Sequence, residues 1–159
     1  MPTQNELEEG MKAPAFTAES SDGGEVSLGD FKGKNVVLYF YPKDNTPGCT
    51  REACGFRDAN AELKKLGTVV LGVSKDSLKA HDKFIGKYDL NFPLLSDPEK
   101  TMHKAYGAWG KKKMYGKLLD GVIRSTFLID GEGTVRKIWR NVKVNGHVEK
   151  VLEAVKSLN

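Results

Sequence analysis

Cys49 and Cys54 are the only two cysteines in the chain, and they lie five residues apart. An apolar run at residues 36–40 comes shortly before them and predicts a strand buried on both faces. A helical pattern follows from residue 47 to about residue 66. The two thiols are therefore expected where a buried strand passes into a helix, a position in which a thiol could act as a nucleophile.

The residues just before Cys49 predict where this helix begins. Thr46 precedes a proline, which disfavours helical geometry, and threonine is a preferred N-cap residue. Pro47 suits the first helical position, where its missing N–H costs nothing. Cys49 is then expected in the first turn, where backbone N–H groups lack helical partners and the helix dipole is positive. Such surroundings favour the thiolate, which is the nucleophilic form of cysteine.

The helical period predicts that the two cysteines face different surroundings. Cys49 shares an inward, mostly apolar stripe, whereas Cys54 falls roughly 140° away on a polar flank. The stripe consists of Cys49, Ala53, Phe56, Asn60 and Leu63, and the flank includes Cys54, Asp58, Ala61 and Lys65. One thiol is therefore expected to be tucked into the fold and the other to look outward.

An intact helix would keep these two thiols from bonding to each other. Five residues along a helix separate the two Cα atoms by roughly 8–9 Å, whereas a disulfide needs them within about 7 Å. If Cys49 and Cys54 form a disulfide, the first turns of the helix must unwind. We therefore expect a reduced state with the helix and an oxidised state with a local loop.

The two cysteines also admit other interpretations. A cysteine on an apolar stripe can simply be a small buried hydrophobic residue. A dithiol oxidoreductase of the thioredoxin type would have Cys-x-x-Cys, whereas here four residues separate Cys49 from Cys54. A metal site is disfavoured because His81, His103 and His147 show no ligand-like spacing to the cysteines.

Strands alternate with helices along the first part of the chain, and a hairpin and a closing helix follow. The expected strands are at residues 15–18, 26–28, 36–40, 68–74, 92–97, 122–130 and 134–139, and the expected helices at residues 47–66, 77–88, 98–106 and 147–158. Residues 107–121 are expected to be irregular. This order predicts an α/β protein of thioredoxin-like fold, with a central mixed sheet flanked by helices and an N-terminal β-hairpin extension.

The composition fits one domain over residues 1–159. The net charge of +4 is mild, and no apolar run approaches the length of a membrane span. The N-terminus has no apolar segment typical of a secretory signal, and paired cysteines in a reducing compartment are often catalytic, so a cytoplasmic enzyme is expected. Lys111, Lys112 and Lys113 lie between Trp109 and Tyr115, which could indicate nucleic-acid binding, but a solvated loop near the active site is the favoured interpretation.

Around the two cysteines and at several later motifs, the chain resembles the peroxiredoxins, in particular the branch of bacterioferritin comigratory protein and peroxiredoxin Q. The resemblance extends from about residue 10 to the last helix. It rests on Pro42, Thr46-Pro47-Gly48-Cys49-Thr50, Cys54, Leu95-Ser96-Asp97-Pro98, Tyr106-Gly107-Ala108-Trp109-Gly110, Lys113-Met114-Tyr115-Gly116-Lys117 and Arg124-Ser125-Thr126-Phe127-Leu128-Ile129-Asp130.

The resemblance implies a role for each residue that matches the family motif. Cys49 would be the peroxidatic cysteine and Cys54 the resolving cysteine of an intramolecular two-cysteine enzyme. Thr46 would offer its hydroxyl to the thiolate and the peroxide, Pro42 would shield the pocket, and Arg124 would hold the thiolate and a peroxide oxygen. The family further implies hydroperoxide substrates, thioredoxin or a similar dithiol protein as reductant, a monomer, and no metal or organic cofactor.

The residue types agree with the role implied for Arg124. A charge at the start of an apolar strand is costly unless it meets an anion. The guanidinium is always charged and presents a planar fork of donors, which suits a thiolate and a polarised peroxide. The alternative is that Arg124 is paired with a carboxylate.

Overall fold

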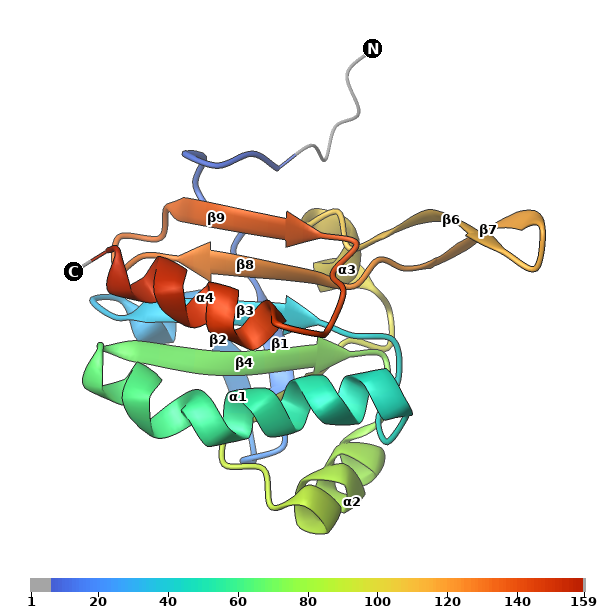
Figure 1. Cartoon of the computed structure of the whole chain (residues 1–159), viewed down its shortest axis with the longest axis horizontal. Helices are drawn as coiled ribbons and strands as arrows, with labels where there is room; N and C mark the ends of the chain where they lie inside the picture. The colour runs from blue at the N-terminus through green and yellow to red at the C-terminus, as the bar shows by residue number, and fades with distance from the viewer. Residues whose placement is uncertain (1–6, 159) are drawn as a thin grey trace.

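A mixed β-sheet lies at the centre of the molecule, with helices on both of its faces (Figure 1). The computed structural model describes residues 7–158. The strands are β1 Thr17–Ser20, β2 Glu25–Ser27, β3 Asn35–Phe40, β4 Thr68–Ser74, β5 Leu94–Ser96, β6 Trp109–Met114, β7 Lys117–Val122, β8 Ser125–Ile129 and β9 Val135–Arg140. The helices are α1 Pro47–Lys65, α2 Leu78–Tyr88, α3 Thr101–Ala105 and α4 His147–Lys156, with a 3-10 turn η1 at Leu28–Phe31.

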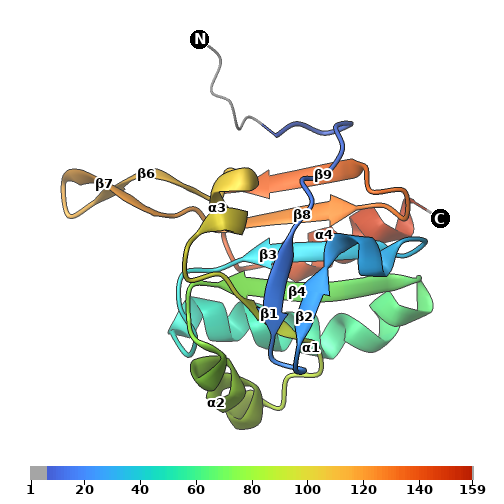
Figure 2. The same cartoon turned by 180° about the vertical axis from the view of Figure 1, so that it is seen from behind.

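The sheet has seven strands within the described residues, in the order β2-β1-β5-β4-β3-β8-β9. Strand β3 runs parallel to β4 and antiparallel to β8, so the sheet is mixed as predicted. The N-terminal hairpin is also confirmed, because β1 pairs with β2 and joins the sheet through β5. Helices α1, α2 and α4 contribute to the core on one face, and α3 packs on the opposite face (Figure 2).

Strand β3 is buried on both faces, as its continuous apolar sequence predicts. Val36, Leu38 and Phe40 point into the core that α3 covers. Val37 and Tyr39 point into the core beneath α1, α2 and α4. Because the strand contributes to both cores, its carboxyl end is held firmly where it passes into the segment before α1.

The first two helices begin and end within one residue of their predicted bounds. Pro47 is the first residue of α1, and Gly67 follows the helix with a φ of 67°, a left-handed conformation that glycine adopts without strain. Ser77 caps α2 by accepting a hydrogen bond from the Ala80 amide at 3.2 Å. The third helix is shorter than predicted, because Lys100 takes a left-handed φ of 63° and delays its start to Thr101.

The expectation of an irregular segment at residues 107–121 is wrong. Strands β6 and β7 pair with each other as a two-stranded ribbon. Met114 pairs with Lys117 across the turn residues Tyr115 and Gly116, whose φ values are 53° and 76°. Two consecutive positive φ values are typical of the tight turn that best fits the twist of a hairpin. The run of lysines lacks the apolar alternation that would have indicated a strand.

The single strand predicted at residues 122–130 is also divided in the structure. Val122 ends β7 and Ser125 begins β8, so Ile123 and Arg124 lie between two strands of different sheets. Arg124 is therefore placed at the boundary between the ribbon and the central sheet. None of the helices in the described part of the chain combines the length and apolar character that a bilayer crossing requires.

Candidate active site

Cys49 lies in the first turn of α1 with 1% of its surface exposed. The chain enters the helix through Thr46, which has an extended backbone, and the Thr50 amide donates to the Thr46 carbonyl at 2.8 Å. The helix start predicted from Thr46 and Pro47 is therefore confirmed. The thiol is buried at the positive end of the helix, where the helix dipole would favour a thiolate.

Arg124 reaches Cys49 from the other side of the site. Its Nη2 donates to the Cys49 Sγ at 3.3 Å, although 75 residues separate the two in sequence. The sheet explains the approach, because Phe40 at the end of β3 pairs with Ser125 at the start of β8. Arg124 precedes Ser125, so β8 delivers the guanidinium beside the segment that leads into α1.

The same guanidinium also binds a carboxylate, Glu52, which the sequence reasoning missed. Arg124 Nη1 donates to Glu52 Oε1 at 2.6 Å, and the Glu52 side chain is fully buried. Arg124 thus contacts both the Cys49 sulfur and a carboxylate, so the two alternatives for this residue hold together. Glu52 follows Cys49 by three residues on the helix, and a charge next to the inward stripe was the signal that could have identified it.

Burial raises the pKa of Glu52 from 4.5 to about 7, and the charge of Arg124 and its hydrogen bond act in the opposite direction. Its second oxygen, Oε2, has no hydrogen-bond partner among the described residues. Burial lowers the pKa of Arg124, but the facing Glu52 and Cys49 outweigh it and raise that pKa above its ordinary value. The guanidinium therefore stays charged, whereas Glu52 titrates near neutrality.

Thr46 and Pro42 lie in the segment between β3 and α1, and both are half-buried. The Thr46 hydroxyl donates to the Lys43 carbonyl at 2.8 Å and makes no capping bond to the helix. Thr46 thus occupies the predicted N-cap position, but its hydroxyl closes a turn in the preceding segment. The roles of both residues toward a substrate remain predictions.

The two cysteines are both free thiols on the same intact helix. Cys54 is partly exposed, whereas Cys49 is buried. The predicted inward stripe is confirmed, because all of its members are buried, namely Cys49, Ala53, Phe56, Asn60 and Leu63. The two thiols thus have the unequal surroundings that the helical period predicts.

Comparison with known proteins identifies the family. The model of the AhpC/TSA family matches residues 10–138. The chain is a peroxiredoxin of this family. It is 55% identical to "Putative peroxiredoxin bcp" of Coxiella burnetii, over 92% of this chain and 97% of that protein. It is 48% identical to "Peroxiredoxin Bcp" of Bacillus subtilis, over 96% and 98% of the two chains.

Solved structures agree with this assignment. A structure of the Xanthomonas campestris bacterioferritin comigratory protein, described for its alkyl peroxide reduction activity, superposes with a TM-score of 0.86. The sequences are 44% identical, and the match covers 89% of this chain and 90% of that one. The predicted thioredoxin-like fold and the predicted branch of the peroxiredoxins are therefore confirmed. Since peroxiredoxins are thiol peroxidases, this protein is an enzyme.

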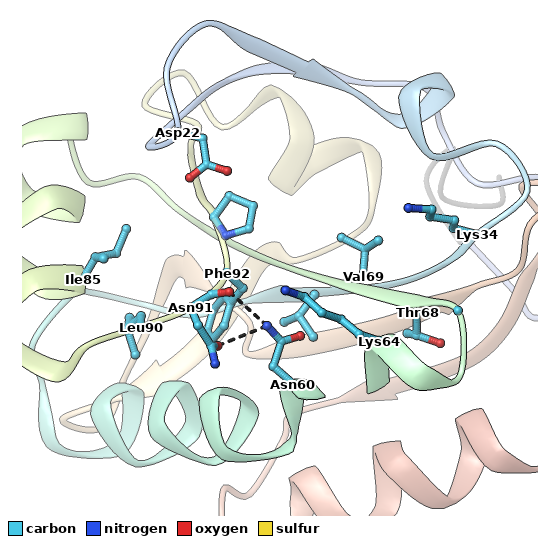
Figure 3. Close-up of a pocket in the computed structure, with 13 residues that line it drawn as sticks. Asp22, Lys34, Asn60, Lys64, Thr68, Val69, Ile85, Leu90, Asn91 and Phe92 are labelled. Atoms are coloured by element: carbon cyan, nitrogen blue, oxygen red, sulfur yellow. Dashed lines mark hydrogen bonds between the residues drawn. The ribbon is translucent and has the colours of Figure 1, made fainter. Parts of the chain in front are cut away.

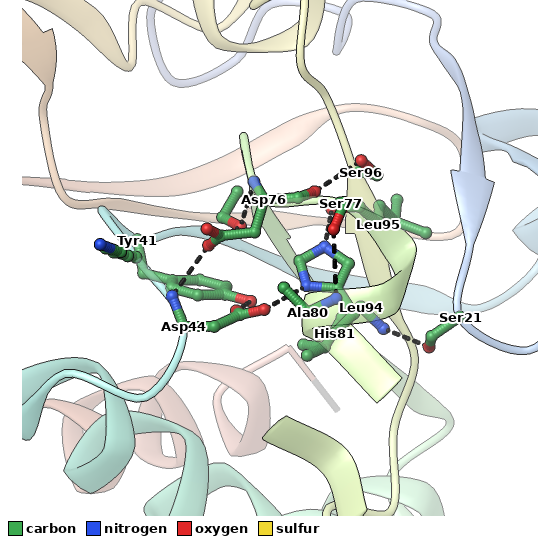
Figure 4. A network of polar contacts seen from close by, with 12 residues as sticks. Ser21, Tyr41, Asp44, Asp76, Ser77, Ala80, His81, Leu94, Leu95 and Ser96 are labelled. Carbon is green, nitrogen blue, oxygen red and sulfur yellow. Dashed lines mark hydrogen bonds and ion pairs between the residues drawn. The ribbon is translucent and has the colours of Figure 1, made fainter. Parts of the chain in front are cut away.

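A buried polar network fixes the segment of this peroxiredoxin that leads into α1 (Figure 4). Asp44 accepts from the Tyr41 hydroxyl at 2.5 Å and lies 2.7 Å from His81 Nδ1. His81 Nε2 lies 3.0 Å from the Leu95 carbonyl, which can only accept, so that nitrogen carries a proton. The contact between Nδ1 and Asp44 therefore holds a second proton, either as an ion pair or on the carboxyl group.

Asp44→Ala is expected to destabilise the fold by about 1–3 kcal/mol, because it leaves the buried Tyr41 hydroxyl and His81 Nδ1 without their hydrogen-bond partner. Urea unfolding at neutral pH measures this change. Asp82→Ala is the matched control, since Asp82 is exposed on α2. Equal stability of the two variants would contradict the proposed anchoring by Asp44.

The large cavity shown in Figure 3 lies away from this site. It has a volume of about 580 Å³ and adjoins Thr68 at the start of β4, whereas α1 begins near the carboxyl end of β3. Asn60 crosses its wall and donates to the carbonyl and side-chain oxygens of Asn91 at 3.0 and 3.1 Å. None of the predicted site residues lines it. Across residues 7–158, no three His, Cys, Asp or Glu side chains gather as a metal site.

Proposed function

We propose that this peroxiredoxin reduces hydrogen peroxide and organic hydroperoxides at Cys49 and then forms a disulfide between Cys49 and Cys54. The observation that supports this most strongly is the 3.3 Å contact between the Arg124 guanidinium and the Cys49 sulfur in the first turn of α1. A cation and a helix N-terminus converge on one buried thiol, and a second thiol lies on the same helix. The alkyl peroxide reduction by the Xanthomonas relative supports the inclusion of organic hydroperoxides.

In the first step, the Cys49 thiolate attacks one oxygen of the hydroperoxide. The O–O bond breaks, the sulfur becomes a sulfenic acid, and the other oxygen leaves as hydroxide or alkoxide and takes up a proton. Arg124 and the N–H groups of the first turn stabilise the charge on that departing oxygen, and the Thr46 hydroxyl joins them when it turns away from the Lys43 carbonyl. Pro42 shields the reacting sulfur from solvent.

In the second step, the Cys54 thiol attacks the Cys49 sulfenic acid, and water leaves as the disulfide forms. The first turns of α1 must unwind for this, because the intact helix holds the two Cα atoms roughly 8–9 Å apart. Unwinding also separates Arg124 from its partners Cys49 and Glu52. The contacts that prepare the thiol for peroxide are thus lost once it has reacted.

In the third step, a dithiol protein such as thioredoxin reduces the disulfide and leaves with a disulfide of its own. One hydroperoxide and two thiols then yield one alcohol or water, a second water and one disulfide. We propose a monomer as the working unit, because both cysteines and Arg124 come from a single chain. We also propose a cytoplasmic location, where a reducing environment would keep the thiols available for peroxide.

Cys54→Ser is expected to keep the single oxidation at Cys49 but to lose steady-state turnover with thioredoxin, because no internal disulfide can form. The experiment couples peroxide consumption to thioredoxin, thioredoxin reductase and NADPH, and compares this variant with the wild type. Mass spectrometry of the oxidised variant should find a single oxygen on Cys49. Normal turnover of Cys54→Ser with thioredoxin would overturn the role proposed for Cys54.

Oxidation of the wild type is expected to lower the helix content and to speed the hydrogen exchange of amides 48–56, because these residues leave the helix. Hydrogen–deuterium exchange followed by mass spectrometry compares the reduced and disulfide forms. Amides of α4 provide the internal reference, since that helix carries neither cysteine. An unchanged exchange pattern at residues 48–56 would contradict the unwinding.

A further inference from the structure

The ribbon formed by β6 and β7 projects from the body of the molecule (Figures 1 and 2). Its two strands pair only with each other and make a sheet separate from the central one. A two-stranded hairpin gains little stability in water on its own. A projecting ribbon of this kind is better suited to contact with another molecule than to supporting the core.

The outer part of the ribbon exposes large apolar side chains. Tyr115 at the turn is 95% exposed, Leu118 is 66% exposed and Leu119 is 45% exposed. Met11 is the only other large apolar residue that is exposed among those the structure describes. Isolated exposed apolar residues are ordinary, but three within five positions at the end of a projection indicate a contact surface.

The ribbon is also strongly basic. It carries four lysines and a single acidic residue, namely Lys111, Lys112, Lys113, Lys117 and Asp120. Asp120 is paired with Lys111 at 3.0 Å, whereas Lys113 and Lys117 are exposed beside Leu118. Apolar and cationic groups therefore alternate over the outer half of the ribbon, which fits a partner with an apolar patch bordered by carboxylates.

More positive charge lies at the base of the ribbon. The Lys75 ammonium lies 5.3 Å from the centre of the Trp109 ring, and the Lys100 ammonium lies 4.9 Å from it. These two lysines come from the segments after β4 and β5, so the basic surface continues from the ribbon onto the body. An approaching acidic partner is attracted along this whole path.

The ribbon adjoins the active site. Its second strand ends at Val122, and after Ile123 the next residue is Arg124, which binds Cys49. The Ile123 amide donates to the Ala108 carbonyl at 2.8 Å and so ties the base of the ribbon to the body. Both views place the ribbon and the start of α1 at the same end of the molecule (Figures 1 and 2).

We propose that the basic, apolar-tipped ribbon is the docking surface for the dithiol protein that reduces the Cys49–Cys54 disulfide. This inference rests on the proposed function and adds the surface that the reductant recognises. A second copy of this chain is a poor occupant, because its net charge is also positive and its own ribbon would bring lysines against lysines. Duplex nucleic acid offers no apolar patch to cover Leu118 and Leu119.

The test reverses charge on the ribbon and, as a control, at the far end of the sheet. One variant combines Lys113→Glu with Lys117→Glu, and the control combines Lys32→Glu with Lys34→Glu. All four lysines are exposed, and Lys32 and Lys34 precede the start of β3, away from the site. Each variant is assayed with hydrogen peroxide and two reductants, a bacterial thioredoxin and dithiothreitol.

The ribbon variant is expected to lose about tenfold or more in kcat/KM for thioredoxin, since steering by charge changes association rates by about 10–10³-fold. Its turnover with dithiothreitol and its rate of oxidation by peroxide should match the wild type. The control should keep its kcat/KM for thioredoxin within about twofold. Added salt should slow the thioredoxin reaction of the wild type more than that of the ribbon variant.

Leu118→Ser provides an independent variant without a change of charge. It should also raise KM for thioredoxin severalfold and leave the dithiothreitol reaction unchanged. Unaltered thioredoxin kinetics in both ribbon variants would overturn the docking proposal. The proposal would also be overturned if the wild type bound duplex DNA in a salt-sensitive way, or formed dimers, and the ribbon variants lost that binding while their thioredoxin kinetics stayed unchanged. Failure of thioredoxin to reduce the wild type would also overturn it. If the wild type consumed no peroxide even with dithiothreitol as reductant, that result would instead contradict the peroxidase proposal itself.

Discussion

Cys49→Ser is expected to reduce peroxide consumption to the background rate. The serine hydroxyl stays protonated at neutral pH and is a weak nucleophile without an adjacent general base. An oxygen at this position also cannot be oxidised to a sulfenic acid, so no disulfide with Cys54 can follow. The loss should be complete for hydrogen peroxide and for organic hydroperoxides alike, because both would react at this one atom.

The substitution should leave the fold intact, which makes the loss of activity interpretable. Serine differs from cysteine by a single atom, and Arg124 can still donate to the hydroxyl oxygen. Circular dichroism and urea unfolding of Cys49→Ser should therefore resemble those of the reduced wild type. Retained peroxide turnover in a correctly folded Cys49→Ser protein would overturn the assignment of the reactive thiol.

Much of the central fold could be predicted because local sequence and tertiary packing agree there. The continuous apolar run at 36–40 predicts a strand that is buried on both faces, and β3 contributes to both cores. Thr46 and Pro47 predict the start of α1, since the backbone restriction before proline acts locally. These features needed no knowledge of which distant segments would meet.

The ribbon could not be predicted in the same way. Its turn places Tyr115 at a φ of 53°, a conformation that side chains other than Asn, Asp and Gly seldom adopt. The lysines of β6 satisfy no core, so the strand lacks the period-two pattern that burial imposes. A projecting strand pair is held by its own backbone hydrogen bonds, and these leave little trace in the pattern of apolar residues.

Arg124 was predicted from the family resemblance, and the cost of a charge beside an apolar strand agrees with a partner for its guanidinium. The structure places Cys49 and Glu52 beside that guanidinium. Glu52 was missed because helical periodicity shows that a carboxylate borders the buried stripe but does not show its counter-ion. The pair of Asp44 and His81 was missed because 37 residues separate the two in sequence.

Arg124→Gln is expected to slow the oxidation of Cys49 by peroxide about 10²–10³-fold, the usual cost of removing one donor that stabilises a developing oxyanion. It should also destabilise the fold by about 1–3 kcal/mol, because the buried Glu52 carboxyl loses its hydrogen-bond donor and must take up a proton. Stopped-flow oxidation and urea unfolding at neutral pH measure the two effects. Each effect alone could follow from a loosened structure, so a second variant is needed.

The double variant Arg124→Gln with Glu52→Gln separates catalysis from stability. Replacing both partners removes the buried carboxyl that the single variant leaves without its donor, so most of the lost stability should return, whereas the rate of peroxide attack should stay low. Recovery of the rate together with the stability would show that Arg124 acts only by supporting the structure. A low rate in a stable protein would place the guanidinium at the reacting atoms.

The pH dependence of stability gives an independent measure of the same pair. Glu52 has its pKa raised from 4.5 to about 7 in the fold by burial, so the folded state binds this proton more tightly than the unfolded state. The stability that the proton provides is complete below about pH 4.5 and is lost as the pH rises through about 7. Since Arg124 lowers the pKa of Glu52, Arg124→Gln should move this loss to higher pH and enlarge it. Glu52→Gln should abolish this loss of stability. A Glu52→Gln protein whose stability fell between pH 5 and 8 as the wild type's does would contradict the assignment to Glu52.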